Sequence, residues 1–291
     1  GHIFKTSSKL IIEGRIATEI NSRIIDSKPL IERDFTITYR NPWTLFIRIP
    51  TIIKFFHKED RGTDDITING LTYTFLLNNN KYKRFEINST IEMIQSKTSN
   101  YEPARNINIR YISNKINKPL NPIGGNYFSF SYSLYGTFLG GDKDFIKIKN
   151  EYRKYFKIYK NNILAFRIVF GAIKNYQNSM LDSEYLFKHG GQSTLRGWVN
   201  SDAFGNYDGS KLSNIINVEY RVPYNKKIGY YFFYDIAHYG NMYSLSEIQS
   251  KWNNGIGFVY NMKLGPIRFD AGFPLGEIKK PQLHVSLLYM F

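Results

Sequence analysis

The chain has 291 residues, no cysteine, 16% aromatic residues and a formal net charge of +15. The absence of cysteine excludes a disulfide framework and any cysteine-based metal site or nucleophile. Mean hydropathy is −0.37, and no stretch approaches the roughly 18 consecutive apolar residues that a membrane helix needs. A membrane-spanning β-strand needs only about 9–11 residues and can be polar at every second position, so these values still permit a β-barrel.

The aromatic and basic residues leave several protein classes open. The 23 Tyr and 22 Phe suit the aromatic girdles of an outer-membrane barrel, but they also favour strands of a soluble β protein. The excess of Lys and Arg could meet anionic lipid or nucleic acid. Apart from a short run at 147–160, however, the basic residues are scattered, which favours a general skew in composition. The chain opens with Gly1-His2 and shows no signal peptide, so we expect a processed or truncated chain.

Alternation of apolar and polar residues with a period of two predicts about fourteen strands. In the N-terminal half the runs are less regular and cover 8–23, 32–41, 44–56, 65–78, 82–97 and 105–113. In the C-terminal half they cover 127–134, 146–158, 164–171, 212–222, 232–236, 255–263, 267–273 and 282–291. About 20 residues per strand and turn suit a membrane barrel.

The two faces of each run distinguish a membrane barrel from a soluble sandwich. In the run at 212–222, Val218 and Tyr220 share one face, and Glu219 and Arg221 share the other. A sandwich would bury its apolar face in a shared core, whereas a barrel places it against lipid and encloses a wet, charged lumen. Phe291 ends the last run with no tail, as outer-membrane barrels end. We therefore predict an all-β fold, a transmembrane antiparallel β-barrel whose single domain covers 1–291.

The segment 177–208 is long for a barrel turn, and long ordered loops usually carry function. Its glycines permit tight turns and close backbone approach, while its Leu and Trp are unfavourable in water. We expect this loop to fold inward and to present one arginine between apolar neighbours. The loop-lock motif comprises Gly190, Gly191, Leu195, Arg196, Gly197 and Trp198.

A guanidinium group inside a lumen needs carboxylate partners. By side-chain parity, Glu219 and Asp235 lie on the lumen face of the next two strands. We predict that Arg196 lies inside the barrel and pairs with one or both. The alternative is a surface loop with a solvated arginine.

The motif Gly190-Gly191-x-x-x-Leu195-Arg196-Gly197-Trp198 resembles the GG…(V/L)RG(F/Y/W) signature of the BamA/TamA surface-antigen superfamily. Further landmarks of that family stand in the same order, and one position departs from its pattern because Ala237 replaces a glycine. The resemblance covers essentially the whole chain, most strongly from about residue 105 onward. The other landmarks are the turn at 114–125 and the strands at 217–223, 233–235 and 265–275.

The resemblance implies a sixteen-stranded barrel of which about fourteen strands are present here. It also implies that the family's first two strands and its N-terminal POTRA domains are missing from this chain. The family's loop folds into its barrel, so the loop-lock motif with Glu219 and Asp235 is expected to be needed for stability or activity. Gly255, Gly257 and Gly272 are expected to loosen the strands around them.

The function implied by the resemblance is insertion and folding of β-barrel proteins in the outer membrane of a Gram-negative bacterium. In BamA-like members the first and last strands meet at a weak lateral seam. The implied partners are unfolded β-barrel clients, outer-membrane lipid including lipopolysaccharide, and accessory periplasmic or lipoprotein subunits. The seam residues of the last strand are Leu283, Val285, Leu287, Tyr289 and Phe291.

Other functions are weighed against this one. A TamA-like or two-partner translocation pore shares the loop motif, whereas a passive porin lacks it. Enzymatic activity is not expected, because Asp235 and His238 face opposite sides of one strand and His189 has no metal ligand at suitable spacing. No cofactor, no metal and no nucleic acid partner is expected.

Overall fold

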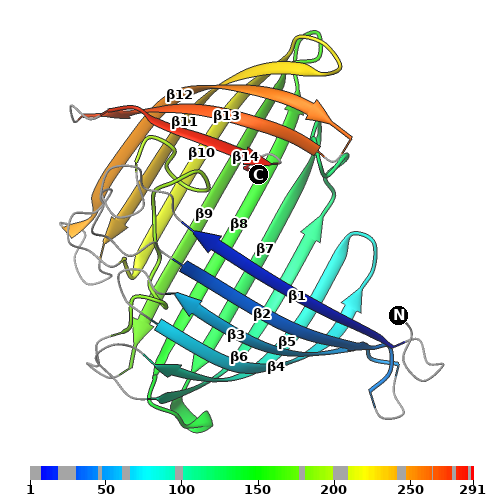
Figure 1. Ribbon diagram of the computed structural model, residues 1–291, viewed down its shortest axis with the longest axis vertical. Helices are drawn as coiled ribbons and strands as arrows, with labels where there is room; N and C mark the ends of the chain where they lie inside the picture. The colour runs from blue at the N-terminus through cyan, green and yellow to red at the C-terminus, as the bar shows by residue number, and fades with distance from the viewer. Residues whose placement is uncertain are drawn as a thin grey trace. The chain divides into compact units, whose positions relative to one another are not determined.

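The computed structural model describes residues 8–18, 31–44, 48–60, 66–95, 101–176, 181–198, 209–240, 247–263, 265–276, 280–287 and 290–291. Within these ranges the fold is all-β, with fourteen strands that follow one another through one antiparallel sheet in chain order (Figure 1). No described segment forms an apolar helix of membrane-spanning length. A short 3-10 turn, η1 (Thr137–Leu139), follows the seventh strand.

The strands are β1 (Lys9–Thr18), β2 (Ile31–Asn41), β3 (Thr51–Asp60), β4 (Ile66–Asn79), β5 (Lys83–Gln95), β6 (Glu102–Asn114), β7 (Gly125–Tyr135), β8 (Phe145–Lys157), β9 (Ile163–Asn175), β10 (Leu212–Pro223), β11 (Ile228–Gly240), β12 (Gln249–Met262), β13 (Gly265–Leu275) and β14 (Gln282–Leu287).

The predicted all-β fold and its fourteen strands are confirmed, and the main differences lie at strand ends. The third strand begins at Thr51 rather than at residue 44, because Pro50 has no N–H to donate to a ladder. β11 is longer than the predicted run 232–236 and covers Ile228–Gly240. The last strand ends at Leu287 rather than at Phe291. The predicted strand residues 19–23, 45–47, 65, 96–97 and 288–289 lie outside the described residues.

The chain forms two compact units. The first comprises Gly1–Tyr111, Ser131–Ile146 and Asn175–Met180, and it contains the antiparallel pairs from β1 through β5. The second comprises Ile112–Phe130, Lys147–Lys174 and Leu181–Phe291, and it contains β9 through β14 and the described part of the long loop. All residues of the loop-lock motif therefore lie in the second unit.

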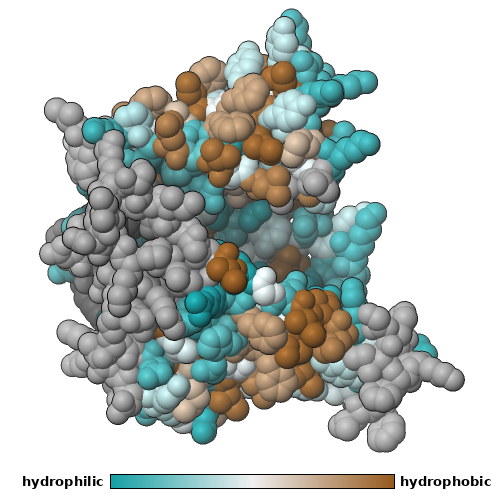
Figure 2. All heavy atoms as spheres, viewed as in Figure 1, coloured by the Kyte–Doolittle hydropathy of each residue, from teal (hydrophilic) through white to brown (hydrophobic). Residues whose placement is uncertain are grey.

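In the second unit the charged side chains lie on the buried face of the sheet and the large apolar side chains lie on the exposed face. Along β10, Glu219 and Arg221 are buried while Tyr220 between them is exposed. Brown and tan residues cover β11 to β14 in the upper part of Figure 2. This arrangement reverses that of a soluble sheet and suits an outer face that lies in lipid. The exposed apolar residues include Phe232, Tyr234, Ile256, Phe258, Phe269 and Phe273.

Two glycines of β12 make room for aromatic rings from β11. Gly255 lies opposite Phe233 and Gly257 lies opposite Tyr231 in the strand register. A Cβ atom on either glycine would come within 2.1 Å of the opposite ring. We expected these glycines to loosen the strand, but their contacts show a packing role: each leaves the space that a ring occupies.

We predict that Gly255→Ala destabilises the fold by about 1–3 kcal/mol, because overpacking forces neighbouring atoms to move. The added Cβ would also lie 2.4 Å from the backbone oxygen of Ala271, which cannot rotate away. The measurement is the urea midpoint of the protein in detergent micelles. Gly14→Ala is the matched control, because nothing lies within 4 Å of the position of its Cβ. Equal midpoints for the two variants would contradict the packing role.

Candidate functional site

The loop that carries the motif is closed by its own backbone hydrogen bonds. Phe187 and Ser210 pair in both directions, with N···O distances of 2.9 and 3.0 Å. Gly190 and Gly191 have φ angles of 98° and 76°, a region that favours glycine. The N–H of Gly191 then donates to the carbonyl of Trp198 at 2.7 Å. The described tip of the loop is therefore a compact turn, with Arg196 near its centre.

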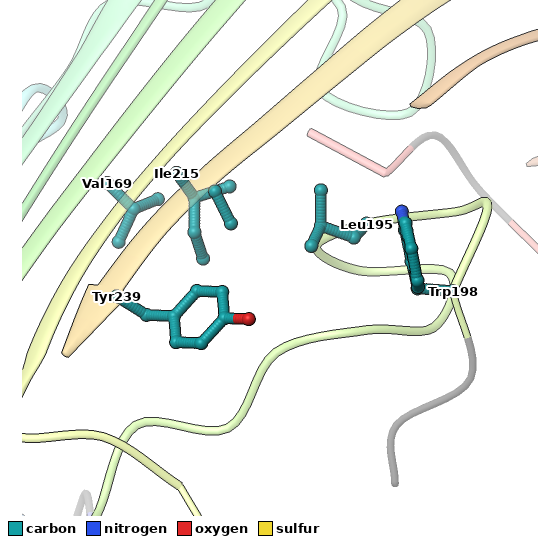
Figure 3. Close-up of a cluster of buried hydrophobic side chains, with 6 residues drawn as sticks. Val169, Leu195, Trp198, Ile215 and Tyr239 are labelled. Atoms are coloured by element: carbon teal, nitrogen blue, oxygen red, sulfur yellow. The ribbon is translucent and has the colours of Figure 1, made fainter. Parts of the chain in front are cut away.

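The apolar side chains of the tip are fully buried. Leu195 and Trp198 have 0% and 1% of their surfaces exposed. They belong to one cluster with Val169 of β9, Ile215 of β10, and Ala237 and Tyr239 of β11 (Figure 3). The indole N–H of Trp198 donates to the carbonyl of Trp252 at 3.2 Å. The loop is thus packed against the buried face of the sheet, and Ala237, which departs from the family pattern, forms part of that contact.

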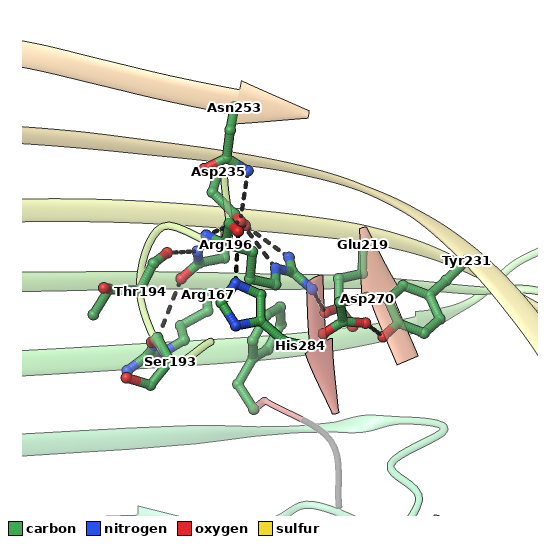
Figure 4. Close-up of polar contacts among 12 residues, drawn as sticks. Arg167, Ser193, Thr194, Arg196, Glu219, Tyr231, Asp235, Asn253, Asp270 and His284 are labelled. Atoms are coloured by element: carbon green, nitrogen blue, oxygen red, sulfur yellow. Dashed lines mark hydrogen bonds and ion pairs between the residues drawn. The ribbon is translucent and has the colours of Figure 1, made fainter. Parts of the chain in front are cut away.

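Arg196 is completely buried and bonded to both carboxylates of its neighbouring strands (Figure 4). Its Nε and Nη2 donate to the two oxygens of Asp235 at 2.9 and 2.7 Å. Its Nη1 donates to Glu219 at 2.5 Å. Its guanidinium carbon lies 3.6 Å from the centre of the Phe233 ring. Burial alone would lower the pKa of Arg196, but attraction to Asp235 and Glu219 raises it above its ordinary value, so the group is charged.

Asp235 is held by more than Arg196. The side-chain amides of Asn217 on β10 and Asn253 on β12 donate to its two oxygens at 2.9 and 3.0 Å. The backbone N–H of Arg196 lies 3.3 Å from the same carboxylate. Donors from β10, β12 and the loop surround this buried carboxylate on β11, and together they fix the position of the loop relative to these three strands.

A second arginine–carboxylate group extends the network. Nε of Arg221 donates to Glu219 at 2.8 Å, and Nη2 of Arg268 lies 3.6 Å from the other oxygen of Glu219. Arg268 also donates to Asp270 at 2.7 Å and to the hydroxyl of Tyr231 at 2.7 Å. Tyr231 in turn donates to Asp270. Together with Arg196 and Asp235, three guanidinium groups face three carboxylates, so their formal charges balance.

The backbone of the loop tip is bound from three further strands. His284 on β14 forms a 2.8 Å hydrogen bond with the carbonyl of Arg196. Nη1 of Arg167 on β9 donates to the carbonyl of Ser193 at 2.9 Å. Gly272 on β13 lies against the same backbone, where a Cβ would come within 2.5 Å of the Arg196 oxygen. The tip therefore contacts β9 through β14.

The sequence analysis identified Arg196, Glu219 and Asp235, and it missed the groups around them. Side-chain parity already placed Arg221 and Asp270 on the same face as Glu219, which was the available signal. The contact of His284 with the loop and the amides that bind Asp235 depend on tertiary distances, which one sequence does not contain. The missed residues are Arg167, Asn217, Arg221, Tyr231, Asn253, Arg268, Asp270, Gly272 and His284.

The predicted seam residues do not all share one face. Leu283, Val285 and Leu287 are 79%, 68% and 60% exposed on β14. We predicted that Phe291 shares the face of Leu283, Val285 and Leu287, and this prediction was wrong. Its side chain is 3% exposed and lies outside the strand. Tyr289 lies outside the described residues.

Burial of an aromatic ring explains the position of Phe291. The ring packs with buried Tyr155, Ile163 and Ala165 in one cluster of the second unit. Nη2 of Arg221 donates to its carbonyl oxygen at 3.2 Å. These contacts remove an apolar ring from solvent and join it to the arginine that binds Glu219.

The chemistry of the site is structural attachment of a loop. Its charged groups are occupied by one another, and the described residues contain no cluster of three side chains that could hold a metal ion. Fully bonded buried networks of this kind make a segment rigid and hold it in one position.

Removing the central arginine should be strongly destabilising. We predict that Arg196→Ala lowers the free energy of unfolding by about 3–5 kcal/mol, because it leaves buried Asp235 and Glu219 without their shared partner. The measurement is the urea midpoint in detergent together with the rate of protease cleavage in the loop. The control is Arg33→Ala, since Arg33 is half exposed and lies 3.7 Å from Glu59, a pair worth under about 1 kcal/mol. Similar losses in both variants would contradict a special role for Arg196.

His189 gives the loop a pH dependence. It is 1% exposed, lies 2.7 Å from the hydroxyl of Ser213, and burial lowers its pKa to about 4. Because the pKa of His189 is lower in the folded than in the unfolded state, the neutral ring stabilises the docked loop fully above about pH 6.5. This stabilisation is lost as the pH falls toward 4. We predict faster protease cleavage of the loop at about pH 4.5 than at pH 7. His189→Gln should reduce that difference, and an unchanged difference would contradict the assignment.

Comparisons with known proteins agree with this geometry. A model of the Omp85 superfamily domain matches residues 22–284. The curated "Outer membrane protein assembly factor BamA" of Nitratidesulfovibrio vulgaris (strain Hildenborough) is 23% identical in an alignment of 218 residues that covers 70% of this chain and 27% of that protein. The chain thus spans about a quarter of the length of that relative.

Two solved structures share the fold. BamA from Haemophilus ducreyi lacking POTRA domains 1–3 matches with a TM-score of 0.74 and 11% identity, over 88% of this chain and 62% of that one. CdiB from Acinetobacter baumannii matches with a TM-score of 0.60 and 10% identity, over 96% of this chain and 54% of that one. With the family model matching most of its length, the chain belongs to the Omp85 superfamily.

Proposed function

We propose that this chain is the membrane domain of an assembly factor that inserts and folds β-barrel proteins in the outer membrane of a Gram-negative bacterium. The observation that carries the proposal is the buried attachment of the loop by Arg196, Glu219 and Asp235, with His284 joining the loop to β14. The similarity to an outer membrane protein assembly factor supports the same function.

The attached loop makes β9 to β13 a rigid support for the last strand. β14 is the shortest described strand, and its described register with β13 comprises six residue pairs. β14 is the last strand in the sheet order, so its edge away from β13 offers N–H and C=O groups to an added strand. In lipid each unsatisfied group costs several kcal/mol, so a client strand that supplies partners is strongly favoured. We propose that this edge is the lateral seam at which clients enter.

The proposed partners follow from this mechanism. They are unfolded β-barrel proteins, accessory periplasmic or lipoprotein subunits that deliver them, and the surrounding lipid with its lipopolysaccharide. The exposed apolar face of Leu283, Val285 and Leu287 would lie against that lipid or against the client. A TamA-like or two-partner translocation pore is the alternative, and the experiment below separates it.

The test is depletion of the full-length parent protein in its own bacterium, followed by quantification of all outer-membrane barrel proteins. We predict a broad loss that is rescued by the wild-type protein and by Arg33→Ala, but not by Arg196→Ala. The reason is that Arg196→Ala, unlike Arg33→Ala, leaves two buried carboxylates without the arginine that pairs with them.

The abundance of each restored protein in the membrane is measured in parallel, so that loss of the variant itself is seen. Unchanged barrel levels after depletion would contradict an insertase. Loss of one exported protein alone would indicate a translocation pore.

A further inference from the structure

A pocket of about 560 Å³ lies within the second unit, at the end of the sheet opposite the long loop. The turns that follow β6, β8, β10 and β12 all reach this end, because the strands run antiparallel in chain order. Three of these turns supply lining residues: Lys118 after β6, Asn161 after β8 and Lys226 after β10. The volume lies in the range of ligand sites and exceeds what one small ion needs.

The lining of this pocket is basic and contains no acidic residue. Its charged members are Lys118, Lys157, Arg221 and Lys226. Arg221 is already paired with Glu219. In the part of the chain that the structure describes, no ion pair is formed by the three lysines. Their positive charge is therefore uncompensated within a concave site, where a low-dielectric wall strengthens attraction for anions.

The turns around the pocket repeat this charge. Four turn segments, 115–124, 158–162, 224–227 and 263–264, contain six lysines and neither Asp nor Glu. The long loop at the opposite end of the second unit differs, because it carries Asp182 and Glu184. In Figure 2, hydrophilic residues gather at the upper right, where these strand ends lie. The positive charge thus belongs to one end of the second unit.

The turns are held in place before any ligand arrives. Lys118 has a φ angle of 48°, a left-handed conformation that Gly and Asn adopt more readily than Lys. Its carbonyl accepts a hydrogen bond from the N–H of Asn121 at 2.9 Å. In the β10–β11 turn the side chain of Asn225 accepts bonds from the N–H groups of Lys227 and Ile228, each at 2.8 Å. These hydrogen bonds fix the turns that carry Lys118 and Lys226.

The polar groups between the lysines suit a peptide. Asn121, Asn161, Asn225 and Asn261 line the pocket, and an amide can both donate to and accept from a peptide backbone. The wall includes Ile163, Tyr231 and Val259 of the buried face and also Tyr230 of the exposed face. Lys118, Lys157 and Lys226 are exposed at this end of the sheet, where a water-borne ligand can reach them.

We propose that this pocket binds an acidic peptide segment, with its carboxylates at Lys118, Lys157 and Lys226 and its backbone at the asparagine amides. The inner wall of the site contains Arg221, which bonds Glu219, and Glu219 in turn bonds Arg196. A bound segment therefore lies next to the network that attaches the loop. The proposal concerns a different surface from the β14 edge and does not depend on insertase activity.

The test uses the full-length parent protein in detergent micelles and two fluorescent ten-residue peptides of mixed sequence, one with four Glu and one with Gln at the same positions. We expect the Glu peptide to bind and its affinity to fall as salt rises. Lys118→Gln, Lys157→Gln and Lys226→Gln combined should weaken binding about tenfold.

The matched control combines Lys115→Gln, Lys227→Gln and Lys263→Gln, which removes the same charge from the same end outside the pocket lining. It should change affinity less than about threefold. Urea midpoints of both triple variants show whether each is folded.

Three results would overturn the proposal. The first is equal binding of the Glu and Gln peptides, and the second is an equal loss of affinity in the two triple variants. The third is that the pocket variant weakens binding only to vesicles that contain anionic phospholipid. Barrel assembly in cells is measured separately, so failure of this site leaves the proposed insertase function unaffected, and the reverse also holds.

Discussion

A guanidinium group with no exposed surface is stable only if its charge is matched, and the second unit is arranged around this requirement at Arg196. An unpaired buried charge costs far more than one residue can recover through packing. Asp235 and Glu219 supply the matching charge, and both carboxylates need further donors because each has more acceptor capacity than Arg196 can fill. The amides of Asn217 and Asn253 and the guanidinium of Arg221 meet that need. The position of one loop residue thereby constrains three strands, β10, β11 and β12.

The same requirement explains the glycines on β12 and β13. The Phe233 ring faces the guanidinium of Arg196, and it also occupies the space that a side chain at position 255 would take. Gly272 allows the loop backbone to approach the sheet, and His284 then binds the carbonyl that this approach brings near. A Cβ at position 272 would push against the loop backbone, whereas a Cβ at position 255 would push against the Phe233 ring that faces Arg196. The glycines therefore set the distance between the loop and the sheet.

Much of this arrangement follows from sequence, for identifiable physical reasons. The period of two along β10 and β11 places Glu219 and Asp235 on one face. A loop arginine that is buried with Leu195 and Trp198 needs carboxylate partners, and these two lie on the face where the loop packs. Strand ends are less predictable, because Pro50 stops a ladder that periodicity alone would extend. Phe291 shows a second limit. As an apolar residue it fitted the alternation of the last strand. In the structure, however, its ring is buried near Tyr155 and does not lie on the exposed face of β14. Contacts between distant strands, such as the bond from His284 to the loop, have no local pattern.

The chain handles charge in two ways, and the difference bears on function. Around Arg196 the charges are balanced and withdrawn from water, where added salt screens them little. At the other end of the second unit the lysines of the turns are unbalanced and open to solvent, where screening is strong. A rigid attachment needs balanced, buried charges, because it must hold under all conditions the cell meets. A site for exchangeable partners needs unbalanced, exposed charges, because binding has to be reversible. Arg221 belongs to both arrangements, since it lines the pocket and also bonds Glu219. A ligand in the pocket would therefore lie beside a side chain of the network that attaches the loop.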